Sequence, residues 1–549
     1  MTTTRTRSLS RWLPLVVVGV VLVLPLRGLL RAPGPPMEEG FMLVFPERVL
    51  HGDIPNKDFL HLYGPGSLWW LAAIFKAFGT SLWTERFAGY AQQVALVAAV
   101  YFAAKPWGRW LAAAGASIAA IIIVPPIGLT ALAWVGGVAL GLWAMIAVTH
   151  QRVVLAGLLG AAALLFRVDL VVAIGLGFFI AARGLPRPKQ LRLVGALAAG
   201  LSLYLVHLAM AGPGNVWEGM VVDPLFNLRG GRRLPLPPSW SHFDGFLQRA
   251  GQLNAPPWPF PAPPSPGQLT LWLGLLVAAV VALVWMGVLA KRRDRTMAGR
   301  TLLVLAVFCV GLLPQALQRA DTTHLAWVSA VPLGLLPIAV REFLDRRRSP
   351  TTEKRRAEHA WIAAAAPFVL LLVLVPHYTL RTYADATVQT FGYHRESYTI
   401  RHGDRTFYYG RKDAVDAVNA MIPDIDKLKR PGDKLFVGTG DLRKTPYSEA
   451  FLYYLFPELR PGTYYIEMDP GVANADDSGL DRQLADSDIV VLSSIRDDWE
   501  EPNDSRTFGS DAPNQVLARD FVKVGSYGNG LFGHGLYELY VTRDRTPAP

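Results

Sequence analysis

The segment that decides the fold is MEEGFMLVFPERVLHGDIPNKDFLHLYGPG, residues 37–66, which directly follows an apolar run. It contains five carboxylates, two histidines and a Tyr-Gly-Pro turn within thirty residues. Ionised groups become costly near the hydrocarbon of a membrane, so acids placed directly against an apolar span favour a functional role. The alternative is a solvated loop, which needs no special explanation.

The composition indicates a membrane protein. Soluble domains carry about 25% charged residues, whereas this chain is 51% hydrophobic and 18% charged. Its single cysteine, Cys309, lies inside an apolar run, which excludes an internal disulfide and a cysteine-based structural metal site. The net charge of +11 comes from Arg and Lys clustered in short loops between apolar segments. That pattern is typical of membrane orientation and argues against nucleic acid as a partner.

About eleven apolar segments follow one another along the first two thirds of the chain, and we interpret them as crossings of a hydrocarbon layer about 30 Å thick. The first follows three arginines and lacks a small-residue cleavage site, so we expect an uncleaved anchor. The twelve residues 68–79 are too short to cross and suit an interfacial helix. The predicted crossings are 12–31, 86–104, 109–124, 129–149, 152–166, 168–183, 191–211, 268–290, 300–318, 322–342 and 358–376.

The basic loops fix the predicted orientation, because Lys and Arg concentrate on the cytoplasmic side. With a cytoplasmic N-terminus, the segments 32–85 and 212–267 become outer loops. We therefore expect a multi-pass protein of the cell membrane, with a transmembrane domain over 1–376 and an extracytoplasmic domain over 377–549.

The tail after residue 376 has more charge and shorter apolar runs than the part before it. An amphipathic helix over 411–428 and strands over 433–438, 487–494 and 536–544 predict a small α/β domain. The fold class is thus mainly α, a transmembrane helical bundle with a C-terminal α/β domain. Seven aromatic residues between 447 and 465 could stack on sugar rings, but a core or an interface to the membrane domain is favoured.

Charged residues of the outer side gather in a few places. Arg167 and Asp169 mark one turn, a basic run covers 229–233, and QRADTTH covers 318–324. Basic residues on this side oppose the usual bias, which favours an anionic ligand, a phosphate first of all. Carboxylates for a base and arginines for an anion are the minimum set for transfer of a group from a phosphate leaving group. We therefore favour an active site over a solvated loop.

The segment 38–66 resembles the first outer loop of the GT-C superfamily of polytopic glycosyltransferases. That superfamily includes protein O-mannosyltransferases, aminoarabinose transferases and bacterial arabinofuranosyltransferases. Its members carry an acidic pair with a following Gly, then Gly-x-x-Pro-x-x-Asp-Phe and Tyr-Gly-Pro; the LLFRVDL and LPQALQRADTTHL segments are also similar. Here the motif residues are Glu38, Glu39 and Gly40, then Gly52, Pro55, Asp58 and Phe59, then Tyr63, Gly64 and Pro65. The usual first acid is Asp, whereas this chain has Glu38.

The resemblance implies a polyprenyl-phosphate sugar as donor and transfer with inversion to an extracytoplasmic glycan, lipid or protein. It implies Glu38 as the base, with Glu39 as its rival and Asp58 as a group that orients the acceptor or assists the base. Arg167 and Arg319 could instead form local ion pairs with Asp169 and Asp321, and the arginines at 232 and 233 could contact lipid headgroups. Candidate phosphate partners are Arg167, Arg232, Arg233 and Arg319, and candidate substrate contacts are His61, Tyr63, Asp169, Asp321 and His324.

No cofactor is predicted to be required, although a divalent metal is compatible with the outer loop. Its hard or borderline ligands match no fixed spacing template; they are Glu38, His51, Asp53, Asp58 and His61. Two other classes compete with an enzyme: a transporter, which would need charges near the midplane and broken helices in repeated halves, and a non-catalytic glycan-binding membrane protein. A ligase for whole lipid-linked glycans is a third alternative, within the enzyme class.

The orientation leads to a labelling test. A cysteine placed at residue 51 or at residue 480 should react with an impermeant thiol reagent in intact cells, because both positions are predicted to lie outside. A cysteine at residue 350 should not react, since it lies in a predicted cytoplasmic basic loop. The parent chain, whose one cysteine lies within an apolar run, provides the background. Labelling at residue 350 alone would contradict the orientation and the outer location of the site.

Overall fold

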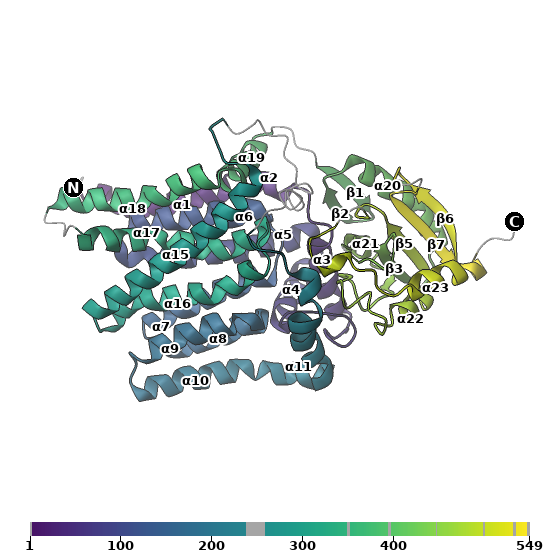
Figure 1. The fold of residues 1–549 in the computed structure, drawn as a ribbon, viewed down its shortest axis with the longest axis horizontal. Coiled ribbons are helices and arrows are strands. Elements are labelled where there is room, and N and C mark those ends of the chain that lie inside the picture. Colours follow the sequence, from purple (N-terminus) through teal and green to yellow (C-terminus); the bar gives the residue numbers. More distant parts are fainter. Residues whose placement is uncertain are drawn as a thin grey trace.

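The computed structural model describes residues 3–237, 259–347, 352–392, 397–445, 447–497, 500–530 and 534–545. Long helices form a bundle at one end of the molecule, and the strands lie in a smaller domain at the other end (Figure 1). The helices of the first part of the chain are α1 (Thr3–Val23), α2 (Leu26–Leu30), α3 (Glu38–Leu50), α4 (Pro65–Phe78), α5 (Leu82–Ala104), α6 (Arg109–Ile127), α7 (Ala133–Thr149), α8 (Val153–Phe166), α9 (Val171–Ala182), α10 (Arg187–Leu201), α11 (Leu203–Ala211), α12 (Pro213–Trp217), α13 (Arg229–Arg232), α15 (Ser265–Arg293), α16 (Met297–Gln318), α17 (Thr322–Arg347), α18 (Glu353–Leu374) and α19 (Thr382–Thr390).

The helical bundle has the features of a polytopic membrane protein. Among the described residues, eight helical segments are long and apolar enough to cross a membrane, and three shorter apolar segments accompany them. The three shorter ones are α7, α8 and the stretch Val168–Ala182, and each coincides with a predicted crossing. The prediction of a mainly helical, polytopic membrane fold is therefore confirmed.

Helices α6 and α17 lie in the interior of the bundle, whereas α10 and α18 are largely exposed. Small residues allow the two interior helices to approach closely. A Cβ atom added to Gly115 on α6 would lie 2.1 Å from the carbonyl oxygen of Gly334 on α17. Close backbone contact of this kind is how helices associate where the surrounding lipid is as apolar as the side chains.

Two segments of the predicted outer side are not crossings. Helix α4 has 14 residues and is not among the apolar segments that could cross, as the sequence predicted. In the predicted loop 212–267, α12 leads into a π-helical stretch, Glu218–Asn227, and then into α13. Residues 238–258 of this loop lie outside the described part of the chain.

The C-terminal domain is built on a mixed sheet of five strands in the order β4-β3-β5-β7-β6, with a separate β1-β2 hairpin. Strand β3 pairs in parallel with β4 and β5, and β7 pairs antiparallel with β5 and β6. The elements are β1 (Tyr398–His402), β2 (Arg405–Tyr409), α20 (Lys412–Leu428), β3 (Lys434–Thr439), α21 (Phe451–Leu455), β4 (Arg460–Pro461), α22 (Leu480–Ala485), β5 (Ile489–Ser493), α23 (Ala512–Asp520), β6 (Phe521–Tyr527) and β7 (Tyr537–Thr542). The sequence predicted α20, β3, β5 and β7.

The aromatic-rich segment of the C-terminal domain forms core and interface, as the sequence favoured. Phe451, Tyr453 and Tyr454 are buried, and α21 packs against α3 of the bundle. The hydroxyl of Tyr454 accepts a hydrogen bond from the Leu82 backbone N–H at 3.3 Å. The hydroxyl of Tyr464 donates to the Asn56 carbonyl at 3.2 Å. These contacts hold the C-terminal domain against residues 32–85, the first predicted outer loop.

Candidate active site

The carboxylate of Glu38 lies in the first turn of α3, where a negative charge is favoured by the helix dipole. Its Oε2 accepts a hydrogen bond of 2.6 Å from the hydroxyl of Tyr447. That hydroxyl in turn accepts from the Met37 backbone N–H at 3.2 Å. Burial raises the pKa of Glu38 above its ordinary value, against the opposing effects of Tyr447 and of the positive charges on Arg319 and Arg496. A carboxylate in this environment is a stronger base than one in water.

The neighbouring Glu39 has a different environment. It is 1% exposed, and its two oxygens accept hydrogen bonds of 2.7 and 2.8 Å from Nε and Nη2 of Arg86 on α5. Arg86 also donates to the carbonyl of Leu30 at 2.9 Å. A bidentate, fully buried pair of this kind fixes the start of α3 against α5 and leaves no oxygen of Glu39 free of the guanidinium. The geometry therefore separates the two acids, with Glu39 in a structural role.

Asp58 and Glu38 share no hydrogen bond in the described part of the chain. The Oδ2 of Asp58 accepts a hydrogen bond of 2.7 Å from the Ile54 N–H, which closes a local turn. Its backbone carbonyl accepts from Arg48 at 2.9 Å. Arg48 follows Glu38 by ten residues on the same helix, a rise of roughly 15 Å. The engagement of the Asp58 carboxylate by the Ile54 N–H is typical of a structural turn.

Arg167, Tyr63 and Asp169 are brought together. Arg167 lies between α8 and α9 and is 6% exposed. Its Nε and Nη2 donate to the two oxygens of Asp169 at 3.0 and 2.6 Å. Its guanidinium lies 4.2 Å from the centre of the Tyr63 ring. The local ion pair that the sequence left open as an alternative is therefore present, and Tyr63 covers it.

Arg232 and Arg319 lie next to each other at the boundary between the two domains. Arg319 Nη1 donates to the Arg232 carbonyl at 3.2 Å. Arg232 pairs with Glu467, at 3.4 Å, and with Asp469. Burial, and then the charge of Asp469, raise the pKa of Glu467 above its ordinary value. The two basic side chains thus meet acids of the C-terminal domain.

Arg319 has acidic partners on both sides. Its Nε donates to Asp321 at 2.8 Å, and its two terminal nitrogens donate to Glu501 at 2.7 and 2.5 Å. Arg233, by contrast, is exposed and forms no ion pair with the described residues. The candidate phosphate partners therefore do not form one set: Arg167 is buried and paired, Arg232 and Arg319 are half-buried and paired, and Arg233 is at the surface.

The remaining candidates are polar; His61 and Asp321 are buried and His324 is half-buried. His61 is 1% exposed, its ring lies edge-on to Tyr63, and burial lowers its pKa to about 3. It is therefore neutral at ordinary pH. Asp321 accepts hydrogen bonds of 2.8 Å from both the N–H and the Nδ1 of His324. Burial acts to raise the pKa of Asp321, but the contacts with His324 and Arg319 hold it below its ordinary value.

The proposed metal ligands of the outer loop are not gathered around one point. Asp53 pairs with Arg48 at 2.7 Å, and His51 is exposed. Among the described residues, the one group with metal-ligand spacing lies in the C-terminal domain and consists of His402, Asp426 and Glu458. Lys429 forms ion pairs with both of these acids. A positively charged side chain therefore already lies beside the two carboxylates.

The structure adds residues that sequence reasoning missed. Each of them contacts, or acts electrostatically on, a residue that the sequence had singled out. The two partners are far apart in the sequence, so no local spacing of residues could reveal the contact. The sequence shows that many aromatic residues surround Tyr447. It does not show that Tyr447 contacts Glu38, which lies 409 residues away. The added residues are Arg86, Tyr447, Glu467, Asp469, Arg496 and Glu501.

Comparison with known proteins supports the fold and little more. No protein-family model and no curated protein matches the chain. The crystal structure of ArnT from Cupriavidus metallidurans bound to undecaprenyl phosphate matches at a TM-score of 0.51 and 12% identity, over 98% of this chain and 100% of that one. At this identity the likeness shows the fold alone, and it extends over both chains nearly from end to end. The protein therefore has the GT-C fold.

Two further solved structures were found at lower similarity. ArnT from Cupriavidus metallidurans in the apo state matches at a TM-score of 0.46 and 14% identity, over 99% of this chain and 100% of that one. The Archaeoglobus fulgidus oligosaccharyltransferase in complex with Zn and sulfate matches at a TM-score of 0.45 and 12% identity, over 95% of this chain and 73% of that one.

The buried pair of Glu39 and Arg86 leads to a stability prediction. Glu39→Gln leaves the Arg86 charge buried without its carboxylate, which should cost about 3–5 kcal/mol of stability. The measurement is the melting temperature of the purified protein in detergent. The double variant Glu39→Leu/Arg86→Met removes both charges and should recover most of the loss. A Glu39→Gln protein as stable as the parent would contradict the structural role of Glu39.

Proposed function

We propose that the protein is a membrane glycosyltransferase that transfers a sugar from a polyprenyl-phosphate donor to an extracytoplasmic glycan, lipid or protein. The single observation that carries this proposal is the environment of Glu38, a partly buried carboxylate with a raised pKa, held at the end of a helix beside basic side chains. The GT-C fold supports it, as does the undecaprenyl phosphate bound to the structurally similar ArnT.

In the proposed reaction Glu38 takes the proton of the acceptor hydroxyl as the oxygen attacks the anomeric carbon of the donor sugar. The attack comes from the face opposite the bond between that carbon and the phosphate oxygen. This bond breaks as the new one forms, so the configuration inverts. The polyprenyl phosphate leaves with the bonding electrons, and nearby guanidinium groups stabilise its charge. A base at the end of the first span suits this reaction, because the donor's lipid tail stays in the bilayer while the acceptor comes from outside.

Arg319 is the strongest of the four candidate phosphate partners. It is near enough to Glu38 to act on its charge, and a guanidinium presents several donors in a fork that fits phosphate oxygens. Its present partners, Asp321 and Glu501, are carboxylates that use the same donors. A donor phosphate would share or take over these hydrogen bonds. Arg167, Arg232 and Arg233 remain secondary candidates.

The candidate substrate contacts have distinct proposed roles. Tyr63 lies over Arg167 and offers an aromatic face of the kind on which a sugar ring packs. His61 supports Tyr63 from the side, with 5.5 Å between the ring centres. Asp169 is the more exposed partner of Arg167, with 42% of its side chain accessible, so it is placed to meet a hydroxyl group. Asp321 and His324 hold Arg319 in position.

We also propose that the protein lies in the cell membrane with its N-terminus in the cytoplasm and its C-terminal domain outside. The positions of two buried charges in the bundle favour a site near the membrane surface over a transport path through the membrane. Glu39 lies in the first turn of α3, and Arg86 lies near the start of α5. Both charged groups therefore belong to helix ends, whereas a transporter would place them near the middle of the membrane.

The base is tested by Glu38→Gln, which keeps the shape of the side chain and removes the proton acceptor. Turnover should fall by about two to four decades, measured as sugar transfer by the purified variant with a panel of radiolabelled polyprenyl-phosphate sugars. Donor binding should survive, because the phosphate partners are other residues. Glu39→Gln, compared per folded molecule, should lose less. If Glu38→Gln and Glu39→Gln, alone and combined, turn over like the parent, the proposed mechanism is wrong.

The phosphate contact is tested by comparing Arg319→Ala with Glu501→Gln. Both variants break the same ion pair between the domains, but only the first removes the guanidinium. A charge-assisted hydrogen bond contributes roughly 1.5–3 kcal/mol, so Arg319→Ala should raise the donor KM by about one to two decades. Glu501→Gln should leave the donor KM unchanged or lower it. An equal rise in both variants would assign Arg319 to domain docking instead.

A further inference from the structure

The proposed site draws on both parts of the chain. On the bundle side, Glu38, Arg232 and Arg319 each have a charged or hydroxyl partner in the C-terminal domain. Those partners are Tyr447, Glu467, Asp469 and Glu501. Together they indicate that the C-terminal domain is part of the site and not an independent attachment, and Tyr447 makes the most direct contact with the proposed base.

The hydroxyl of Tyr447 has a defined hydrogen-bond direction. It accepts from the Met37 N–H at 3.2 Å and donates to Glu38 Oε2 at 2.6 Å. Because the backbone N–H can only donate, the phenolic hydrogen is left for the carboxylate. The bond to Glu38 is short, as expected for a hydroxyl that donates to an ionised acceptor. The ring itself is fixed by burial and by the Arg496 guanidinium, 5.2 Å from its centre.

The backbone around Tyr447 is also held against α3. The Phe451 N–H donates to the Pro36 carbonyl at 3.2 Å. A Cβ atom on Gly40 would lie 2.4 Å from the Phe451 nitrogen, so α3 and the start of α21 touch backbone to backbone. These contacts lie on both sides of Glu38 in the sequence. The position of the hydroxyl relative to the carboxylate is therefore set by main-chain packing.

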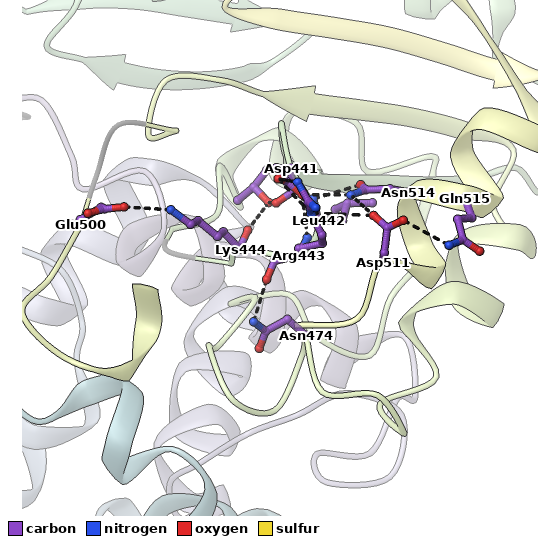
Figure 2. Close-up of polar contacts among 10 residues, drawn as sticks. Asp441, Leu442, Arg443, Lys444, Asn474, Glu500, Asp511, Asn514 and Gln515 are labelled. Carbon is purple, nitrogen blue, oxygen red and sulfur yellow. Dashed lines mark hydrogen bonds and ion pairs between the residues drawn. The ribbon is translucent and has the colours of Figure 1, made fainter. Parts of the chain in front are cut away.

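On its other side, Tyr447 belongs to the connection between β3 and α21, which a polar network fixes within the C-terminal domain (Figure 2). Asp441 accepts from Arg443 at 2.8 Å and from Asn514 at 2.9 Å. Lys444 pairs with Glu500 at 2.9 Å, next to the Glu501 that binds Arg319. The connection that carries Tyr447 and the segment that reaches Arg319 are thus tied together.

We propose that Tyr447 is a positioning residue for the reaction: it holds one oxygen of Glu38 so that the other oxygen faces the acceptor hydroxyl, and the C-terminal domain thereby completes the catalytic site. The inference rests on the proposed function, in which Glu38 is the base. Tyr447 touches neither substrate nor the transferred proton, and it acts only through Glu38. The acceptors it suits are those whose hydroxyl can reach the boundary between the two domains.

The test is the pH dependence of kcat in Tyr447→Phe, with Tyr464→Phe as the matched control. Tyr464 also donates its hydroxyl across the domain boundary, but to the Asn56 carbonyl and not to a carboxylate. The Tyr447 hydrogen bond favours the ionised form of Glu38. Its loss should raise the pKa of Glu38, so the acidic limb of the profile should move up by roughly one to two pH units. The donor KM should not change.

A second variant tests the opposite direction. Incorporation of 3-fluorotyrosine at position 447 keeps the shape of the side chain and gives a more acidic hydroxyl, so it should donate more strongly and move the acidic limb to lower pH. This variant also serves if Tyr447→Phe does not fold. The control Tyr464→Phe should have the pH profile of the parent.

The outcomes separate this inference from the proposed function. If Glu38→Gln is inactive but neither change at position 447 moves the acidic limb, Tyr447 has no positioning role and the inference is wrong, while the base assignment stands. A uniform fall in kcat at every pH would likewise show a merely structural role. If Glu38→Gln is fully active, Glu38 is not the base, and the premise of this inference fails before Tyr447 is tested.

Discussion

The buried pair between Glu39 and Arg86 determines how the rest of the site is arranged. Consecutive residues of an α-helix point about 100° apart, so two adjacent acids in the first turn of α3 cannot face the same surroundings. Arg86 binds the second acid from inside the bundle, and this fixes the rotation of α3 about its axis. The first acid, Glu38, is then directed toward the C-terminal domain and Tyr447. One ion pair thereby divides the acidic motif into a structural residue and a candidate base.

Charge balance explains how two arginines are accommodated at the boundary between the two domains. Arg232 and Arg319 come from separate segments of the bundle part, and each is neutralised by acids of the C-terminal domain. Buried ion pairs contribute little net stability once desolvation is counted, but loss of one partner is costly. Their main effect is therefore on geometry: they favour the arrangement of the two domains that brings these charges together. The pairs of Arg319 also hold its guanidinium near Glu38.

The sequence predicts the elements well and the contacts between them poorly. The apolar segments give the helices, and α20 and β5 follow from their periodicity and apolar run, because these signals are local. The pairing of Arg167 with Asp169 could also be anticipated from the sequence, since they lie only two positions apart. The strands β1, β2, β4 and β6 were missed because they are short or carry mixed polar residues, so pairing with neighbours defines them. From the sequence, Tyr447 could be recognised only as one of several aromatic residues in its segment.

The distinction between Glu38 and Glu39 shows the limit most clearly. Both are Glu, both stand before a glycine in an acidic motif, and no property of either residue assigns the role. The difference between the two acids depends on the ion pair with Arg86, and in the sequence Arg86 appears only as the first residue of a predicted crossing. Asp58 is the converse case. The motif makes it prominent, but its carboxylate closes a turn with Ile54.

The contact at Gly40 has a mechanical consequence. Where two elements meet through side chains, rotamer changes absorb small displacements. Here the main chains of α3 and α21 are in direct contact, since even a methyl group on Gly40 would lie 2.4 Å from the Phe451 nitrogen. Side-chain rearrangement therefore has little room to absorb a displacement of the start of α21 relative to α3. Because Glu38 lies in the first turn of the same helix, a rotation of the C-terminal domain at this contact would also shift the Glu38 carboxylate.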